Sequence, residues 1–201
     1  MKESNLTFSI IIIGDAGVGK TSIYRRYVYE TFDQNTLSTI GLQFSFKDVE
    51  LNNKKIIKLK LIDTAGEEKY RSLSKSYFRN ADAAIFVFAF DNLSSFQNIT
   101  NWIEVFKDNH DRVDKIPKYL VGNKNDLEKK VEKNLIDDLQ KKIGYKYFST
   151  SALNNDNIEE LFKDLAEKVF KSYNPNAKQK NIQVAKQETF KKSKCNLCNE
   201  H

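Results

Sequence analysis

The stretch Gly14-Asp15-Ala16-Gly17-Val18-Gly19-Lys20-Thr21 decides how the rest of this chain is interpreted. It fits the pattern G-x-x-x-x-G-K-[ST], in which glycines let successive backbone N–H groups turn inward around an anion. Lys20 brings a positive charge to the outer phosphates, and the Thr21 hydroxyl is a ligand for Mg²⁺. Residues 8–13 predict a buried strand, and residues 22–30 predict a helix whose N-terminus faces the phosphates. The stretch therefore predicts a site for the phosphates of a nucleotide.

The four residues Asn123-Lys124-Asn125-Asp126 indicate which base the nucleotide carries. The Asp126 carboxylate can accept hydrogen bonds from the ring N–H and the exocyclic amine of guanine. Adenine offers no such pair of donors, and a mismatch of this kind can reject the wrong base by roughly 10⁴-fold. In a chain rich in Lys and Asn the four residues also suit a solvated turn, but downstream of a phosphate-binding stretch they favour guanine. Ser149-Thr150-Ser151-Ala152-Leu153, after a strand-like run, can supply backbone N–H groups near the base.

Asp63-Thr64-Ala65-Gly66-Glu67 follows another strand-like run, over residues 56–62. An aspartate at a strand end can hold Mg²⁺ directly or through water, and the Gly66 N–H can reach a γ-phosphate. Thr39 lies in a polar, irregular segment over residues 31–41. Its hydroxyl can complete the Mg²⁺ coordination when a γ-phosphate is present, which would order that loop.

With these motifs in this order, the chain resembles a small GTPase of the Ras superfamily, and specifically a Rab. The Rab-like stretches are Ile40-Gly41-Leu42-Gln43-Phe44, Lys69-Tyr70-Arg71-Ser72-Leu73 and Ser76-Tyr77-Phe78-Arg79-Asn80-Ala81, within a match over about residues 7–172. The resemblance implies a switch that binds GTP or GDP with Mg²⁺, hydrolyses GTP and regulates vesicle-mediated membrane traffic. It also implies four kinds of protein partner, which are an exchange factor, a GAP, a GDP-dissociation inhibitor or escort protein, and effectors. We expect a monomer.

The resemblance also assigns roles to residues. Phe32 would stack on the guanine, Thr21 and Thr39 would ligate Mg²⁺, and Asp63 would hold it through water. The two switch segments would be residues 31–45 and 63–80. Lys20 and Glu67 would carry the catalysis. The residues expected to contact the nucleotide are Asp15, Ala16, Gly17, Val18, Gly19, Lys20, Thr21, Ser22, Phe32, Thr39, Gly66, Asn123, Lys124, Asp126, Ser151, Ala152 and Leu153.

Three residues depart from the family pattern. Glu67 replaces the glutamine that positions water, and an ionised glutamate only accepts hydrogen bonds and adds a negative charge beside the γ-phosphate. It can instead serve as a general base if that charge raises its pKa, so the direction of its effect on turnover stays open. Ala16 adds a methyl group where an arginine finger would approach. Ile62 replaces a tryptophan between Phe44 and Tyr77, the expected effector surface.

Apolar runs alternate along the chain with amphipathic stretches. The predicted strands span residues 8–13, 43–51, 56–62, 83–91, 116–122 and 145–148, and the predicted helices span 21–30, 94–109, 132–143 and 157–172, with a short one within 72–80. This alternation predicts an α/β fold with helices on both faces of a mostly parallel six-stranded sheet, which fits a P-loop NTPase G domain. Asn52-Asn53 predicts a hairpin and one antiparallel edge strand.

Some single residues also carry local predictions. Ser94 and Asn157 suit helix N-caps, and Gly144 suits a helix end. Trp102 and Phe106 are predicted core residues, because they lie four apart on a helix. His110 is predicted to be a solvated residue at a helix end.

The composition changes after Tyr173, where Asn174-Pro175-Asn176 ends the last predicted helix. We therefore predict a G domain over residues 1–172 and a flexible tail over residues 173–201. Residues 171–201 hold seven Lys and two Glu, a net +5 against +6 for the whole chain. A basic tail can bind nucleic acid, but no aromatic interleaving accompanies this one. An electrostatic patch for an anionic membrane surface is favoured, and no nucleic acid is expected.

Cys195 and Cys198, both in the tail, are the chain's two cysteines. The chain shows no disulfide framework, signal peptide or membrane-spanning apolar run, which predicts a cytoplasmic protein. Two alternatives to lipidation of these thiols are a redox pair and a partial zinc site completed by His201. The last four residues have the length of a C-a-a-X box with unusual polar residues. The resemblance implies prenylation of one or both cysteines and reversible anchoring to the cytosolic face of an intracellular membrane.

Two other functions compete with a cycling switch. Glu67 and Ala16 suggest a GTP-binding docking platform with little intrinsic hydrolysis. An ATPase or nucleotide kinase is opposed by Asp126 and by the lack of an Arg-rich insertion that would form a lid.

Overall fold

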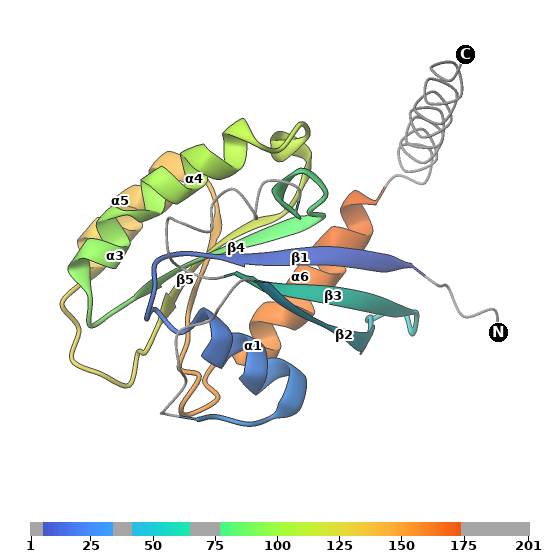
Figure 1. Cartoon of the computed structure of the whole chain (residues 1–201), viewed down its shortest axis with the longest axis horizontal. Coiled ribbons are helices and arrows are strands. Elements are labelled where there is room, and N and C mark those ends of the chain that lie inside the picture. The colour runs from blue at the N-terminus through green and yellow to red at the C-terminus, as the bar shows by residue number, and fades with distance from the viewer. Residues whose placement is uncertain (1–5, 34–41, 65–76, 174–201) are drawn as a thin grey trace, which may run out of the picture. The chain divides into compact units, whose positions relative to one another are not determined.

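The computed structural model describes residues 6–33, 42–64 and 77–173, which form a six-stranded sheet flanked by helices (Figure 1). The strands are β1 (Thr7–Ile13), β2 (Leu42–Glu50), β3 (Ile56–Thr64), β4 (Ala83–Ala89), β5 (Lys118–Asn123) and β6 (Lys146–Ser149). They lie in the order β2-β3-β1-β4-β5-β6. All neighbours pair in parallel except β2 and β3, so the predicted α/β fold with one antiparallel edge strand is confirmed.

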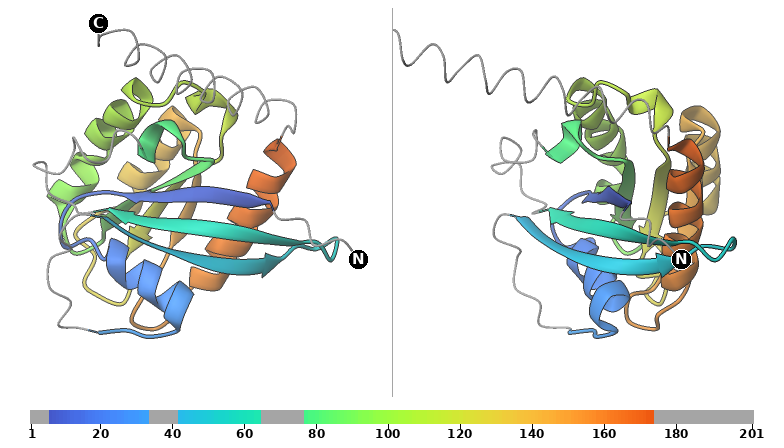
Figure 2. Two further views of the ribbon diagram at one scale, coloured as in Figure 1. Left: turned by 45° about the vertical axis from the view of Figure 1, so that its right-hand side comes forward. Right: turned by 90° about the vertical axis from the view of Figure 1, so that its right-hand side faces the viewer.

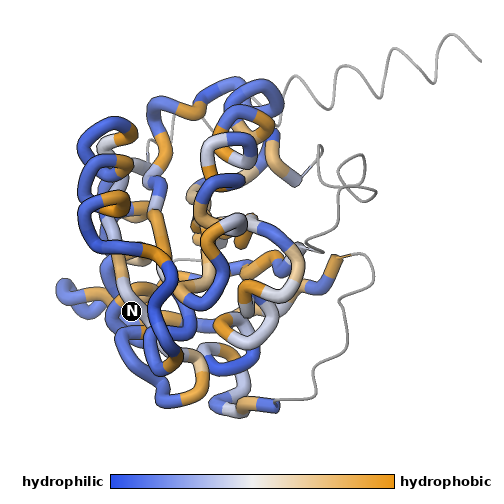
Figure 3. The backbone as a smooth tube through the Cα atoms, turned by 90° about the vertical axis from the view of Figure 1, so that its left-hand side faces the viewer, coloured by the Kyte–Doolittle hydropathy of each residue, from blue (hydrophilic) through white to orange (hydrophobic). Residues whose placement is uncertain are grey.

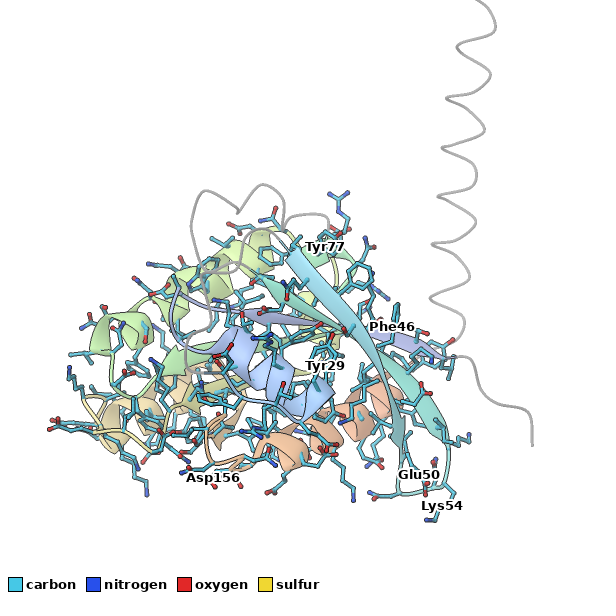
Figure 4. All side chains as sticks on the ribbon, turned by 60° about the horizontal axis from the view of Figure 1, so that its bottom comes forward. Tyr29, Phe46, Glu50, Lys54, Tyr77 and Asp156 are labelled. Carbon is cyan, nitrogen blue, oxygen red and sulfur yellow. The ribbon has the colours of Figure 1, made fainter. Side chains whose placement is uncertain are left out.

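The hairpin between β2 and β3 turns at Asn52-Asn53, as predicted. Its backbone closes through the Leu51 N–H, which donates to the Lys55 carbonyl at 2.8 Å. Glu50 and Lys54 lie at this end of the hairpin in Figure 4, where their side chains form an ion pair at 2.8 Å. The hairpin is short because two turn-forming residues interrupt two strand-forming runs.

Helices cover both faces of the sheet. They are α1 (Lys20–Tyr29), α3 (Leu93–Gln97), α4 (Ile99–Asp108), α5 (Lys133–Ile143) and α6 (Ile158–Ser172), with a 3₁₀ turn over Val113–Lys115. Figures 1 and 2 show α1 and α6 on one face and α3, α4 and α5 on the other. No helix among the described residues is long and apolar enough to cross a membrane.

Aromatic side chains fill the core on both faces. On the first face, the Tyr27 ring of α1 stacks on Phe162 of α6 with their centroids 3.9 Å apart. On the second face, Phe106 of α4 meets Phe86 of β4 edge-on at 5.7 Å. Trp102 and Phe106 are both buried, as predicted. Along the helices in Figure 3, hydrophobic positions alternate with hydrophilic ones, as expected when one helix face packs on a sheet.

Two local predictions for the helix over residues 94–109 are wrong. The stretch forms two helices that meet at Asn98, and the cap is Asn92, whose side chain accepts from the Ser95 N–H at 3.1 Å. Ser94 instead donates its hydroxyl to the Asn92 side chain at 2.7 Å. The Asn92 side chain therefore caps the helix two residues earlier than the Ser94–Gln97 pattern predicts.

The prediction that His110 is solvated is also wrong, because its side chain is only 3% exposed. The ring stacks on Phe106, Nε2 contacts the Ala81 carbonyl at 2.9 Å, and Nδ1 accepts from the Arg112 N–H at 3.1 Å. A proton on Nε2 satisfies both contacts, so this histidine ties the start of β4 to the end of α4. The predicted helix end at Gly144 is confirmed, with Gly144 in the left-handed region at φ +70°.

Candidate nucleotide site

The loop over residues 14–19 joins the end of β1 to the start of α1, and two of its glycines are fixed by close packing. A Cβ on Gly14 would lie 2.2 Å from the Val87 carbonyl oxygen, and a Cβ on Gly19 would lie 2.2 Å from Nδ2 of Asn123. Both residues have positive φ, +151° and +90°. A side chain at either position would displace the loop or its neighbour, so the observed turn needs glycine at both.

Lys20, the first residue of α1, is held inside this loop. Its side chain is 5% exposed, and Nζ donates to the Asp15 carbonyl at 2.7 Å. Burial lowers the pKa of the Lys20 ammonium to about 8, while the carboxylates of Asp63 and Asp15 oppose that shift. Phosphate charges at this point would favour the charged form in the same way.

Thr21 and Asp63 meet where α1 begins and β3 ends. The Thr21 hydroxyl donates to Oδ2 of Asp63 at 2.6 Å. Asp63 is fully buried, and its Oδ1 has no hydrogen-bond partner among the described residues. Burial raises the pKa of the Asp63 carboxyl to about 6, against the hydrogen bond from Thr21 and the charge of Lys20. A hydroxyl beside a carboxylate with a free oxygen is an oxygen donor set that suits Mg²⁺.

The described residues contain no cluster of three or more His, Cys, Asp or Glu that could hold a metal ion by themselves. The Thr21–Asp63 pair therefore supplies only part of a coordination shell. Such a shell agrees with the usual behaviour of Mg²⁺, which keeps several waters and phosphate oxygens as ligands.

Asn123, at the end of β5, connects the phosphate loop to the loop after β6. Its Nδ2 donates to the Val18 carbonyl at 2.9 Å. Its Oδ1 accepts from the Thr150 hydroxyl and from the Ala152 N–H, both at 3.3 Å. One buried amide thus fixes the distance between three motifs that are far apart in the sequence.

The expected base pocket is assembled around Asp126. The Ser151 hydroxyl donates to Oδ1 of Asp126, which fixes that carboxylate in place. Lys124 has a positive φ of +63°, and its Nζ pairs with Oδ2 of Asp91 at 3.2 Å. The Arg26 guanidinium lies 5.8 Å from the centre of the Phe32 ring. Three residues predicted to contact the base, Asp126, Lys124 and Phe32, therefore each lie against another described side chain.

The expected effector surface differs from the prediction at one residue. Phe44 on β2 is 52% exposed, but Ile62 is only 2% exposed and belongs to the core cluster that contains Phe78. Ile62 pairs with Phe44 across the two strands, yet it does not lie exposed between Phe44 and Tyr77 as expected. The Lys60 ammonium lies 4.5 Å from the Phe44 ring centre and 5.9 Å from that of Tyr77. Tyr77 and Phe46 are labelled in Figure 4, beside β2.

Five predicted residues lie outside the described residues. They are Thr39, Gly66, Glu67, Cys195 and Cys198. The roles given to them stay predictions.

Sequence reasoning missed contacts that link the site to its surroundings. Arg26 donates from Nε to the Ala152 carbonyl at 2.8 Å and from Nη2 to the Leu153 carbonyl at 3.1 Å, which holds α1 to the base loop. Asp91, the partner of Lys124, was also missed. Neither residue belongs to a motif with fixed spacing, so the sequence gives no signal for these contacts.

Comparisons with known proteins agree with this geometry. The Ras family model matches residues 9–171. Ras-related protein Rab-13 of Bos taurus is 38% identical over 161 residues, which cover 79% of this chain and 78% of that protein. Ras-related protein Rab-10 of Diplobatis ommata is 39% identical over 170 residues, with 84% of each chain covered. Ras-related protein Rab-11B of Dictyostelium discoideum is 39% identical over 165 residues, which cover 81% of this chain and 74% of that protein.

Proposed function

This chain belongs to the Rab branch of the Ras family and is a GTPase of membrane traffic, and from this premise we propose a specific function. We propose that the protein is a cycling GTP/GDP switch that requires Mg²⁺. The observation that carries the proposal is the position of Asn123, which holds the phosphate loop at Val18 and the base loop at Ala152. A nucleotide that spans these two loops would meet Lys20 at one end and Asp126 at the other.

Mg²⁺ would be held by the Thr21 hydroxyl and, directly or through water, by Asp63. The buried Oδ1 of Asp63 without a hydrogen-bond partner supports this assignment, because a buried carboxylate oxygen needs a compensating group. When bound, the ion would neutralise charge that develops on the phosphate oxygens. Thr39 is proposed as a further ligand in the GTP state, which would order residues 31–45.

Hydrolysis needs a water in line with the γ-phosphate and donors for the developing charge. Lys20 supplies one such donor, since its ammonium is already fixed at the Asp15 carbonyl. Glu67 would either take a proton from the water or repel the transferring group, according to its protonation state. The second candidate function, a docking platform that rarely hydrolyses GTP, rests on this residue and on Ala16.

The base specificity can be tested with Asp126→Asn. We expect the purified wild-type protein to release bound GDP or GTP on chromatography and to prefer GTP over ATP. The side-chain NH₂ of Asn at position 126 would face an N–H donor of guanine, and two donors cannot form a hydrogen bond. The affinity for GDP should therefore fall by roughly 100-fold or more. Asp138→Asn, a change at an exposed residue of α5, is the control and should keep wild-type affinity. Equal affinity for ATP and GTP in the wild type would overturn the guanine assignment.

We also propose that effectors dock on Phe44 and Tyr77 in the GTP state. Phe44 is exposed on the edge strand β2, and Tyr77 lies within the proposed second switch segment, residues 63–80. An exchange factor, a GAP and a GDP-dissociation inhibitor or escort protein are the other proposed partners. A tail prenylated at Cys195 and Cys198 would anchor the protein reversibly to the cytosolic face of an intracellular membrane.

A further inference from the structure

The side chain of Asp15 is held by a helix outside the phosphate loop. Its Oδ1 accepts from the indole Nε1–H of Trp102 at 2.7 Å, and its Oδ2 accepts from the Asn98 side-chain amide at 2.9 Å. Both carboxylate oxygens therefore have a donor on or beside α4. Asp15 and Trp102 lie 87 residues apart in the sequence.

The two donors are themselves fixed. Asn98 and Trp102 are one helical turn apart, and the backbone N–H of Trp102 donates to the backbone carbonyl of Asn98 at 3.2 Å. Trp102 is only 5% exposed and belongs to the core of that face of the sheet. Just before Asn98, the buried Ser95 hydroxyl accepts from the Ala89 N–H at 3.1 Å, which ties α3 to the end of β4. The indole donor is thus set by the core, and the exposed Asn98 lies one helical turn before it.

The main chain of the same aspartate holds Lys20. The Asp15 carbonyl accepts from the Lys20 ammonium at 2.7 Å, while the Asp15 carboxylate accepts from Trp102 and Asn98. A carboxylate free to turn toward a bound triphosphate would repel it, because like charges at short range raise the energy of both. Two hydrogen bonds that direct it to α4 remove that freedom and satisfy its charge.

We propose that Asp15 is a positioning residue: Trp102 and Asn98 hold its carboxylate away from the phosphates and so fix the carbonyl that orients Lys20. This proposal rests on the proposed nucleotide site. It adds that nucleotide retention depends on α4, which contributes no residue to the expected phosphate or base contacts.

Release of a fluorescent GDP analogue from the full chain tests the proposal. Trp102→Phe keeps an aromatic ring in the core but removes the N–H donor, and we expect roughly tenfold faster release. Asp15→Ala should have a similar effect, and the double variant should be no faster than the quicker single variant, because both changes break one interaction. Thr100→Ala is the matched control, since that hydroxyl of α4 donates to the carbonyl of Gln97, the last residue of α3, at 3.3 Å.

A spectroscopic readout separates positioning from a general loss of packing. Trp102 is the chain's single tryptophan, so its indole Nε1–H gives one proton resonance. We expect Asp15→Ala to shift that resonance and Thr100→Ala to leave it in place. Release at the wild-type rate from Trp102→Phe, or additive effects in the double variant, would overturn the proposal. If the wild-type protein failed to bind the GDP analogue at all, the nucleotide site itself would be wrong.

Discussion

Gly19 shows at the residue scale how one missing side chain connects two motifs. The space that its Cβ would fill is taken by Asn123, whose amide donates to the Val18 carbonyl at 2.9 Å. The phosphate loop and the base loop can therefore approach only if position 19 has no side chain. The pattern of glycines in the sequence predicts a phosphate loop, and the structure adds which neighbour makes this glycine necessary.

Gly19→Ala and Gly17→Ala should differ for this reason. Both residues have positive φ, but a Cβ on Gly17 meets no atom of the described residues within 4 Å, whereas one on Gly19 meets Nδ2 of Asn123 at 2.2 Å. We expect Gly19→Ala to weaken GDP binding by at least about tenfold more than Gly17→Ala, which is about 1.4 kcal/mol in binding free energy. Equilibrium titration with a fluorescent GDP analogue measures both. Equal losses would show that backbone strain alone, and not the contact with Asn123, makes glycine necessary.

At the scale of elements, the α3–α4 pair is held at its start by an Asx cap. The Asn92 side chain accepts from the Ser95 N–H and from the Ser94 hydroxyl. Asn98 and Trp102 of this helix pair donate to the Asp15 carboxylate in the phosphate loop. The cap at Asn92 therefore also supports the position of these two donors.

Asn92→Ala should lower the free energy of unfolding by about 1 kcal/mol, the usual cost of losing an N-cap. Ser94→Ala, at the residue that the sequence pattern favoured as the cap, should cost clearly less, because its hydroxyl donates to Asn92 and caps no backbone N–H. Urea unfolding of both variants gives the comparison. A larger loss for Ser94→Ala would contradict the assignment of the cap.

Much of the fold and of the site could be predicted from local patterns. The strand–loop–helix around Lys20 and the Asn52-Asn53 hairpin follow from apolar runs, glycine spacing and turn residues, which act within a few positions of each other. Contacts between distant residues could not be predicted this way. His110 was predicted to be solvated because no local pattern reveals its contact with the Ala81 carbonyl, and Ile62 was assigned to the effector surface because no local pattern reveals the core cluster that buries it.

At the scale of the whole molecule, most of the net positive charge lies in the C-terminal segment of the sequence. Residues 171–201 carry a net +5 of the chain's +6, and both cysteines lie among them. A single lipid chain gives marginal and reversible membrane binding, and stable anchoring needs a second signal. The lysines of the tail, each worth about 1 kcal/mol near an anionic surface, are one such signal.

We expect Cys195→Ser and Cys198→Ser to lower membrane association in steps if both thiols are prenylated. Each single variant would keep one lipid and the tail lysines and would bind more weakly than the wild type, and the double variant, with the lysines alone, would stay in the supernatant. Sedimentation with vesicles that contain anionic lipid, after prenylation of the full chain, measures the bound fraction. Full binding by one of the single variants would instead mean that only the other cysteine carries a lipid.

Single-turnover hydrolysis of GTP by the Mg²⁺-loaded full chain, compared between the wild type and Glu67→Gln, tests the cycling switch most directly. We predict a measurable wild-type rate with GDP as the bound product, and a change of less than about tenfold in the variant, because Glu67 can accept a proton from the attacking water. Retained GTP and no detectable hydrolysis in the wild type, with turnover restored by Glu67→Gln, would contradict the cycling switch and favour the docking platform.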